Sequence, residues 1–495
     1  MVNLSLGINS IMNNFTGMRN TSKGQVSEKY KHNLGLVMTI LILASLLGDF
    51  AINPVSGQDT DLPVYIVQAG DTISSIALRF NVTTDDIIRE NGITDANLVN
   101  IGTPLRIPGL EGISGVLTSE VIPFGVTLSD LTRINQVNEQ DLIILNKYTS
   151  PSEIIAGMKM IIPVKEITPA FTYLSQVSFD SSPLSFAIVN NTSPWILEDQ
   201  NNLFETWLLL PNDNLLSLSD ENSSLINKPL VQSLSIAQLP LVQGETVKVS
   251  IQTNQAVDIK ASLDNKPFSF FSETENEYIA LHGIHAMQEP GVYPLHLAIN
   301  PQSGSEYHID QLLLITEGEY AQDPEIYVDD IYVDNETIRL DEEELDSIVS
   351  VITPIRYWDG LFSSPISDPS CIVGYFGNRR SYNDGALLYY HTGVDFSVCI
   401  AENLYAYAPA KGKVVFADDT VIRGNAVVID HGWGVFSGYW HLAEINVNTG
   451  DLLEPGDLIG MIGNTGRSAG PHLHFEVIVN GTAVNPLDWL TKVYP

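Results

Sequence analysis

The sequence predicts a multidomain protein with small βααβ modules near the N-terminus, a β-sandwich connector in the middle and an all-β C-terminal domain. A chain of 495 residues is too long for one hydrophobic core, so several domains are expected. A repeat of 55 residues without a gap indicates two copies of one small fold. Short runs of alternating polar and apolar residues follow, as in strands with one buried face.

The N-terminal region contains an apolar run at residues 34–47, LGLVMTILILASLL, which follows Lys29 and Lys31 and precedes a polar stretch. Its length suits a signal-peptide core and is short of the ~20 apolar residues that a spanning helix needs. We therefore expect a leader at residues 1–33 and an export segment at residues 34–55. Because the leader is long for a signal peptide, residues 34–55 are either removed or retained as a membrane anchor. The protein is thus expected to be extracytoplasmic, either secreted or anchored to the membrane.

The chain is strongly acidic, with 59 acidic and 24 basic residues and a net charge of -35. Such a charge repels phosphate backbones and anionic lipids, so nucleic acid is not an expected partner. The acid is concentrated at residues 317–350, where Arg339 is the one basic residue. This composition predicts a solvated acidic linker.

The two cysteines, Cys371 and Cys399, both lie in the C-terminal region. Two cysteines are too few for a Cys-rich zinc finger. They either form one disulfide in an oxidising compartment or remain two buried thiols, and the sequence does not decide between these alternatives.

The repeat comprises a first copy at residues 64–108 and a second at residues 119–163. Each copy is predicted to contain a strand, a glycine turn, two short helices and a second strand that ends near a proline. In the first copy, Asp71 or Thr72 is expected to cap the first helix, and Thr84 is expected to cap the second.

The first copy resembles a LysM module in its opening YxVxxGDTxxxIA motif, its central asparagine and its closing GxxLxIP motif. The matching residues are Tyr65, Val67, Gly70, Asp71, Thr72, Ile76, Ala77, Asn91, Gly102, Leu105, Ile107 and Pro108. The resemblance implies binding to the N-acetylglucosamine chains of peptidoglycan or chitin. The second copy has Glu120 and Val126 in place of Tyr65 and Asp71, so it either binds glycan as well or is structural only.

Residues 169–316 are predicted to form a β-rich, Ig-like connector. Alternating apolar residues such as Val247, Val249 and Ile251 indicate short strands, and Asn, Gly and Pro residues between the runs indicate turns. The region also contains His282 and His285. We expect these two histidines to be structural, because no third ligand lies near them in the sequence.

The residues that carry the chemistry are predicted to lie in the C-terminal domain, residues 351–495. Five of the ten histidines fall there, and four of these occur in three short motifs. The motifs are His391-Thr-Gly-Val-Asp395, Tyr439-Trp-His441-Leu442 and Gly470-Pro-His472-Leu-His474-Phe-Glu476.

These motifs suit a zinc hydrolase, which needs three nitrogen or oxygen ligands and one open position for water. His391 and Asp395 are four residues apart, so they project to the same side of a strand or helical turn. His472, His474 and Glu476 alternate with apolar residues, so on a strand they share one face. One strand therefore offers a metal ligand and an acid–base group about 7 Å apart.

Residues 374–490 resemble the lysostaphin-type peptidoglycan endopeptidases, a family of zinc metallopeptidases. The family motifs FGxR, HxGxD, APxxGxV, YxHL and GxTGxSxGPHLHFE occur in that order at Phe376–Arg379, His391–Asp395, Ala408–Val414, Tyr439–Leu442 and Gly463–Glu476. The resemblance implies an antiparallel, all-β metallopeptidase domain with its site in a groove. Strands are consistent with this at Val414–Phe416, Ala426–Ile429 and Leu473–Val479.

The same resemblance assigns one Zn²⁺ ion to His391, Asp395 and His474. It makes His441 and His472 the catalytic pair that orients and deprotonates the attacking water and steadies the oxyanion. Glu476 either orients a histidine or has a plain surface or core-edge role. His431 is expected to be structural. The family often has a tyrosine before the first ligand, and neither Tyr389 nor Tyr390 can be assigned to that role from the sequence.

The sequence thus predicts a zinc-dependent endopeptidase that hydrolyses peptide cross-links or stem peptides of bacterial peptidoglycan, brought to the wall by LysM glycan binding. The alternative is a catalytically silent cell-wall-binding activator of another murein hydrolase. The presence of all three expected ligands and of both catalytic histidines favours the enzyme. The expected partner is peptidoglycan, with a possible membrane tether through residues 34–55.

Overall fold

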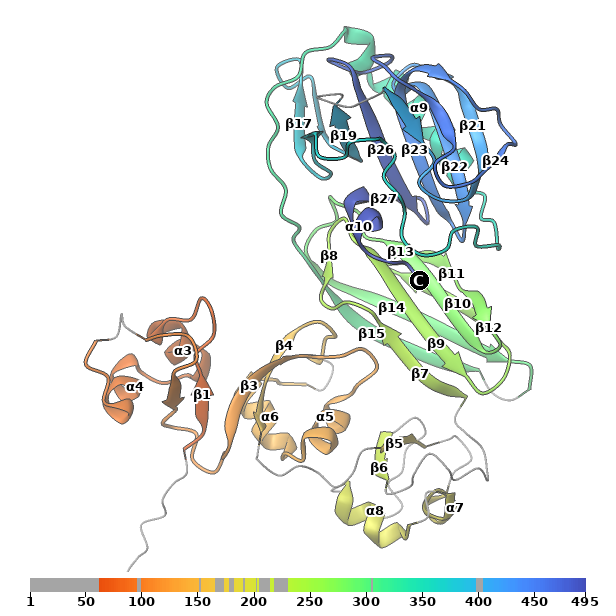
Figure 1. Ribbon diagram of the computed structural model, residues 1–495. Coiled ribbons are helices and arrows are strands. Elements are labelled where there is room, and N and C mark those ends of the chain that lie inside the picture. Colours follow the sequence, from red (N-terminus) through yellow and green to blue (C-terminus); the bar gives the residue numbers. More distant parts are fainter. Residues whose placement is uncertain are drawn as a thin grey trace, which may run out of the picture. The chain divides into compact units, whose positions relative to one another are not determined.

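The computed structural model describes residues 62–95, 99–150, 153–164, 173–177, 182–189, 192–201, 203, 214–217, 230–303, 306–397 and 404–495 (Figure 1). The predicted leader, residues 1–33, and the apolar segment, residues 34–55, lie outside the described residues. Among the helices that the structure describes, none is long and apolar enough to cross a membrane.

Both N-terminal modules have the predicted βααβ order. The first consists of β1 (Val64–Ile66), α3 (Ile73–Phe80), α4 (Thr84–Asn91) and β2 (Pro104–Arg106). The second consists of β3 (Val116–Val121), α5 (Leu128–Asn135), α6 (Glu139–Asn146) and β4 (Lys159–Val164). Their four strands form one sheet in the order β2-β1-β3-β4.

The helix caps of the first module agree only in part with the prediction. Thr72 caps α3 in a capping box with Ser75. The side-chain oxygen of each residue accepts a hydrogen bond from the backbone N–H of the other. The cap of α4 is Thr83, which accepts a hydrogen bond from the backbone N–H of Asp86. The prediction of Thr84 was therefore wrong by one residue, because two adjacent threonines are equally suited to capping.

A β-sandwich occupies residues 231–316. One sheet has the order β11 (Lys266–Ser269), β10 (Val257–Leu263), β14 (Gly291–Pro301), β15 (Tyr307–Thr316) and β8 (Leu241–Val242). The other has the order β12 (Phe271–Thr274), β13 (Glu277–Gly283), β9 (Thr246–Thr253) and β7 (Val231–Ile236). Alternate residues such as Val249, Ile251, Leu297 and Ile299 are buried in a common core, as their spacing predicts.

The first part of the predicted connector differs from a sandwich. Strand β5 (Tyr173–Gln176) pairs antiparallel with β6 (Asn214–Ser217), and the helices α7 (Pro183–Val189) and α8 (Pro194–Gln200) lie between them in the chain. Both helices begin with a proline, which is suited to the first helical position because its missing N–H has no helical partner there. The connector sandwich therefore begins near residue 231 rather than residue 169.

The acidic segment also differs from the solvated linker that its composition predicts. It contains the short helix η4 (Asp330–Val333) and the helix α9 (Asn335–Val349). One carboxylate of α9, Asp341, is buried, accepts a hydrogen bond from the backbone N–H of Ile422 at 3.0 Å and forms an ion pair with Arg423. Val349 at the end of α9 joins an apolar cluster of the C-terminal domain. Composition alone does not reveal that a single carboxylate faces inward.

The C-terminal domain is built on one large sheet, and its antiparallel pairing confirms the predicted class. The main strand order is β16 (Ile372–Gly374), β19 (Val394–Ser397), β26 (His472–Val479), β23 (Val435–Ile445), β22 (Gly424–Gly432), β21 (Gly412–Thr420) and β24 (Leu452–Leu453). Strand β25 (Leu458–Ile462) pairs with β23 and with β20 (Tyr405–Tyr407), and β27 (Thr482–Val484) pairs with β26. The hairpin of β17 (Arg379–Tyr382) and β18 (Leu387–Tyr390) and the helix α10 (Pro486–Thr491) complete the domain. Cys371 just before β16 is disulfide-bonded, and Cys399 lies outside the described residues.

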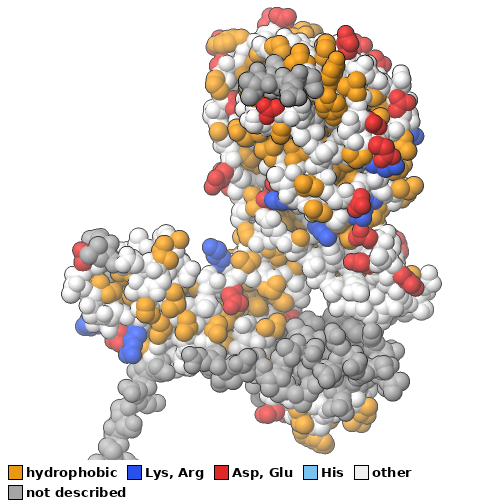
Figure 2. Space-filling view, viewed as in Figure 1, with side chains coloured by type: hydrophobic (Ala, Val, Ile, Leu, Met, Phe, Trp, Pro, Cys, Tyr) orange, Lys and Arg blue, Asp and Glu red, His pale blue; other side chains and the backbone are white. Residues whose placement is uncertain are grey.

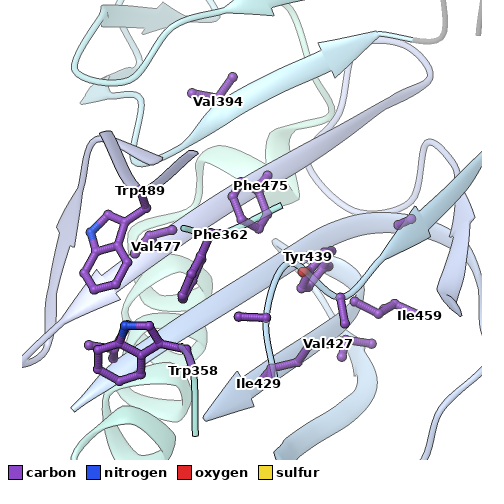
Figure 3. Packing of buried hydrophobic residues seen from close by; sticks show 14 of the residues in the cluster. Trp358, Phe362, Val394, Val427, Ile429, Tyr439, Ile459, Phe475, Val477 and Trp489 are labelled. Atoms are coloured by element: carbon purple, nitrogen blue, oxygen red, sulfur yellow. The ribbon is translucent and has the colours of Figure 1, made fainter. Parts of the chain in front are cut away.

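One face of this sheet is the apolar core of the domain (Figure 3). Tyr439 of β23 and Phe475 of β26 are wholly buried there, with Trp358, Phe362 and Trp489 in the same cluster. Side chains alternate along a strand, so the neighbours of these two residues are turned to the other face: Trp440 beside Tyr439, and His474 and Glu476 on either side of Phe475. The core therefore determines which polar residues meet on the opposite side.

Replacement of Asp341 by alanine is expected to destabilise the C-terminal domain by about 3 kcal/mol, because the largely buried Arg423 would lose its ion-pair partner. Calorimetry of the full chain would show this as a lower Tm of the C-terminal transition. Glu343→Gln, at an exposed position of the same helix, should change the unfolding free energy by less than about 0.5 kcal/mol. Equal Tm values for the two variants would show that α9 is a detached linker.

Candidate metal centre

Three buried side chains of the C-terminal domain converge on one point. His391 Nε2 lies 2.9 Å from Asp395 Oδ1 and 3.0 Å from His474 Nδ1. His474 Nδ1 in turn lies 3.1 Å from Asp395 Oδ1. Their exposed fractions are 2%, 5% and 6%. Within the described part of the chain, they are the one group of three or more His, Cys, Asp or Glu residues arranged as metal ligands could be.

Strand pairing brings these residues together. Asp395 of β19 and His474 of β26 are direct cross-strand partners. Residues in such positions have Cβ atoms about 4.5–5.5 Å apart, so their side chains meet on one face of the sheet. His391 precedes β19 and is held by its backbone, whose N–H donates to the carbonyl of Asn378 at 2.9 Å. The sheet thus joins motifs that are distant in the sequence.

The polar neighbours of the two histidines indicate which nitrogen faces the cluster. His391 Nδ1 lies 2.9 Å from the carbonyl oxygen of Tyr375, and a carbonyl can only accept, so Nδ1 carries the proton. His474 Nε2 lies 3.5 Å from the Glu476 carboxylate. The lone pairs of His391 Nε2 and His474 Nδ1 therefore point toward Asp395 Oδ1. Three lone-pair donors this close repel one another unless a cation lies between them, so the donor set fits Zn²⁺.

The charges around the cluster also suit a cation. Burial lowers the pKa of His391 to about 4, although Asp395 opposes the shift. Burial alone would raise the pKa of Asp395, but the three neighbouring histidines hold it well below its ordinary value. For His474, burial lowers the pKa, whereas Asp395 and Glu476 outweigh burial and raise it. His391 is thus neutral and Asp395 ionised, the forms that bind metals, and the two carboxylates favour a positive charge at His474.

His441 and His472 lie beside the three-residue cluster. Their ring centroids are 5.0 Å apart, and His472 Nε2 lies 3.4 Å from Asp395 Oδ1. His441 Nδ1 lies 2.8 Å from the Thr465 carbonyl and His472 Nδ1 lies 2.7 Å from the Gly470 carbonyl, so both Nδ1 atoms donate. Burial and the neighbouring His472 and His474 lower the pKa of His441 well below its ordinary value. His441 is therefore a neutral imidazole whose Nε2 can accept a proton.

A β-bulge in β23 turns His441 toward this face. Two residues of β23, Trp440 and His441, stand where β22 supplies only one, and His441 has a left-handed backbone with φ of 66°. In an unbroken strand His441 would share the core face with Tyr439, two residues earlier. A non-glycine residue in this conformation is strained, and such strain is typical of functional sites.

The sequence motifs did not identify Arg380, which binds the second oxygen of Asp395. Its Nη2 donates to Asp395 Oδ2 at 2.6 Å and its Nε donates to Asp323 Oδ2 at 2.9 Å. The FGxR motif directs attention to the adjacent Arg379, whose guanidinium instead lies 5.6 Å from the ring centroid of Tyr320. Nothing in the sequence separates the two neighbouring arginines.

Glu476 lies behind His474, away from the cluster. The carboxylate is 3% exposed and accepts a hydrogen bond from Trp440 Nε1 at 2.7 Å. Its other close neighbour is His474 Nε2 at 3.5 Å. This is the position from which a carboxylate can orient a histidine ligand, and it does not fit an exposed surface role.

The remaining histidines that the sequence raised have other neighbours. His431 is engaged at both nitrogens, by the Lys411 carbonyl at 2.9 Å and the Ser437 hydroxyl at 2.8 Å, as expected for a structural residue. His285 Nε2 lies 3.0 Å from the hydroxyl of Tyr390. His282 lies against the ring of Phe268, with centroids 5.1 Å apart.

Two pockets flank the cluster and form a groove. One is lined by His441 and Glu476 together with Asp341 and Glu342 of α9. The other is lined by Asp395, by His472 and by the loop residues 467–471. The hydroxyl of Tyr389 donates to Glu342 at 3.3 Å at the edge of the first pocket. The two pockets share Arg380, Tyr382, His441 and Arg467 in their linings, so they meet beside the cluster.

Residues 389–486 match the model of Peptidase family M23, and residues 65–108 and 124–163 match the model of the LysM domain. The chain therefore carries a Peptidase family M23 domain and two LysM domains. The five histidine and aspartate residues of the site all lie within the M23 match. The resemblance that the motifs indicated is thus confirmed.

Known relatives match about a quarter of this chain or less. The peptidoglycan DD-endopeptidase ShyA of Vibrio cholerae is 37% identical over 123 residues, which are 25% of this chain and 28% of that protein. The DD-carboxypeptidase/endopeptidase Mpg of Neisseria meningitidis is 40% identical over 97 residues, 20% of this chain and 22% of that protein. The matched region thus spans less than a third of either relative.

A solved structure, the catalytic domain of the antimicrobial peptidase lysostaphin from Staphylococcus simulans, is similar at 28% identity. The match covers 27% of this chain and 93% of that chain, with a TM-score of 0.20.

Glu476→Gln is expected to weaken the binding of Zn²⁺ by about 10–100-fold, because a neutral amide holds the His474 imidazole less firmly than a carboxylate does. Competition with a chromogenic chelator measures the affinity. Glu444→Gln is the matched control, since Glu444 is an exposed glutamate on the neighbouring strand β23. An unchanged affinity for Glu476→Gln would leave Glu476 with a packing role only.

Proposed function

We propose that this protein is a zinc-dependent endopeptidase that hydrolyses peptide cross-links or stem peptides of bacterial peptidoglycan, and that its LysM domains hold it on the glycan. The convergence of His391, Asp395 and His474 beside two further imidazoles carries the proposal. The names of the relatives, a peptidoglycan DD-endopeptidase and a DD-carboxypeptidase/endopeptidase, support the substrate class.

The ligands of the metal would be His391 Nε2, Asp395 Oδ1 and His474 Nδ1. A zinc ion bound there polarises the scissile carbonyl and lowers the pKa of water. Arg380 holds the second oxygen of Asp395, and Glu476 faces the outer nitrogen of His474. These two contacts keep the ligand side chains in place before a substrate binds.

His441 and His472 supply the acid–base chemistry. The neutral Nε2 of His441 accepts the proton of the attacking water, because burial keeps this imidazole uncharged. The same Nε2, once protonated, steadies the oxyanion and then gives this proton to the leaving amine. His472, whose ring centroid lies 5.0 Å from that of His441, orients the water through the lone pair of its Nε2. The Nδ1 bonds of both rings to backbone carbonyls hold them in the required tautomer.

The protein acts outside the cytoplasm, where peptidoglycan lies. Residues 34–55 serve as a cleaved signal peptide or as a retained membrane anchor, and a disulfide between Cys371 and Cys399 suits an oxidising compartment. Nucleic acid is not a partner of a chain with net charge -35. On the face shown in Figure 2, lysines and arginines are few and interspersed with carboxylates, without a broad basic patch.

The catalytic assignment is tested with purified peptidoglycan and mass spectrometry of the released fragments, which also identifies the bond cleaved. His441→Ala and His472→Ala should each lower the cleavage rate by about 10²–10⁴-fold, because the first removes the base that accepts the proton of the water and the second removes the imidazole that orients this water. Both variants should retain bound zinc. His308→Ala, at an exposed histidine of β15, should cleave at the rate of the parent protein.

The metal assignment has a separate readout. His391→Ala, Asp395→Ala and His474→Ala should each lose bound zinc, as measured by elemental analysis, and lose cleavage with it. A chelator should abolish the activity of the parent protein, and added Zn²⁺ should restore it. Full zinc occupancy without any released fragment would instead support the catalytically silent activator.

A further inference from the structure

The segment that departs from the β-sandwich, residues 173–217, repeats the layout of the two LysM domains. Its elements follow in the same order, strand β5, helices α7 and α8, and strand β6. Each of its landmarks lies 55 residues after the corresponding landmark of the second module. The first helices of the three modules begin after Thr72, Thr127 and Ser182, and the second helices after Thr83, Asn138 and Ser193.

The caps of the first helices are equivalent in their bonding. In each module the capping side chain and the side chain three residues later exchange hydrogen bonds with each other's backbone N–H. The third module does this with Ser182 and Ser185, at 2.8 and 3.1 Å. A reciprocal capping box needs suitable side chains at two positions, so its recurrence at the same spacing is more specific than a single cap.

An asparagine at the end of the second helix makes the same three hydrogen bonds in every module. The side chain of Asn201 donates to the carbonyls of Leu197 and Leu216 at 3.0 and 3.1 Å, and its oxygen accepts from the backbone N–H of Leu216 at 2.6 Å. Asn91 and Asn146 bind the residues four before and fifteen after them in the same way. This asparagine clamp joins the helix to the last strand.

Strand register and core positions agree as well. Ser175 pairs with Leu215 in the third module, as Glu120 pairs with Met160 in the second and Tyr65 with Leu105 in the first. Four equivalent positions are buried in all three modules, each with at most 4% of its surface exposed. They are Val67, Ile122 and Val177; Ile76, Leu131 and Phe186; Ile87, Leu142 and Leu197; and Leu105, Met160 and Leu215.

The third module lacks the residues by which the family is recognised in a sequence. Gly70 and Gly125 correspond to Asp180, and the closing prolines of the first two modules correspond to Leu218. The apolar positions retain their character, although none of them has the same residue in all three modules. A search by sequence motif therefore passes over it, whereas the hydrogen bonds and the register reveal it.

We infer that residues 173–217 form a third module of the LysM type, and that its ligand is a neutral glycan strand, as proposed for the first two. The choice of ligand rests on the proposed function. The charge of the segment supports it, since residues 173–217 hold five acidic residues and no Lys, Arg or His. Such a surface does not attract phosphate-bearing polymers, whereas its many amide and hydroxyl side chains are groups that hydrogen-bond to sugars.

Three modules in tandem make wall binding multivalent. A glycan strand presents the same disaccharide many times, so each bound module raises the effective concentration of the next. Loss of the third module should therefore lower retention on the wall without changing the peptidase site. Retention and cleavage can be measured separately.

Retention is measured by sedimenting the full chain with insoluble peptidoglycan. Every variant also carries Asp395→Ala, which prevents cleavage. Asn201→Leu removes the asparagine clamp of the third module at nearly constant volume, and Asn91→Leu is the matched variant in the first. Each is expected to lower the affinity for peptidoglycan about tenfold or more. Asp199→Asn, an exposed position on α8, should leave the affinity unchanged.

Hydrogen exchange tests the fold of the third module with Asn201→Leu. It tests the ligand in a chain whose modules are all intact. Asn201→Leu should speed the exchange of backbone amides within residues 173–217 only, and unchanged exchange there would overturn the assignment of the fold. In the full chain carrying only Asp395→Ala, soluble N-acetylglucosamine oligomers should slow exchange both in residues 64–108 and in residues 173–217.

Slower exchange in residues 64–108 alone would overturn glycan binding by the third module and leave the proposed function standing. If the oligomers slow exchange in neither segment, and Asn91→Leu is retained on peptidoglycan as well as the chain without it, glycan binding is overturned for all the modules. The peptidase assignment is tested independently, through fragment release by the parent protein.

Discussion

The active site depends on one pairing between two strands, in which Asp395 of β19 stands directly opposite His474 of β26. This register places a carboxylate and an imidazole on the same face of the sheet. A slip of either strand by one residue would turn its polar side chain into the core and bring an apolar residue to the opposite face. The buried Phe396 and Phe475, which follow them on the core face, resist such a slip. Hydrophobic packing on one face therefore holds the proposed metal ligands on the other.

Polar contacts then extend outward from this pair. Arg380 holds the second oxygen of Asp395, and Glu476 lies 3.5 Å from the outer nitrogen of His474 while it accepts a hydrogen bond from Trp440. Arg423 lies over the Trp440 ring, 5.4 Å from its centroid, and forms the buried ion pair with Asp341 of α9. A continuous set of contacts thus connects a metal ligand with the helix in the acidic segment. In a low-dielectric interior such a set is stable only when every charged group has a partner.

The N-terminal half illustrates how a small fold persists while its sequence changes. What the three βααβ units share is a set of physical requirements: a capping oxygen, an asparagine that joins helix and strand, and four apolar positions that fill the core. Several residue types satisfy most of these requirements, because many side chains can cap a helix or fill a small core. Only the asparagine clamp, which needs a donor and an acceptor on one side chain, is kept in identity.

The sequence by itself determined the domain class and the first two modules, and it singled out the residues proposed as metal ligands, because these depend on local periodicity and on short motifs with a strict order. It left several features undetermined. The inward turn of Asp341 out of an acidic helix, the choice of Arg380 over its neighbour and the bulge that brings His441 into the groove all arise between segments distant in the chain. Tertiary structure decided them, because which face of a strand or helix is buried depends on the partner that packs against it.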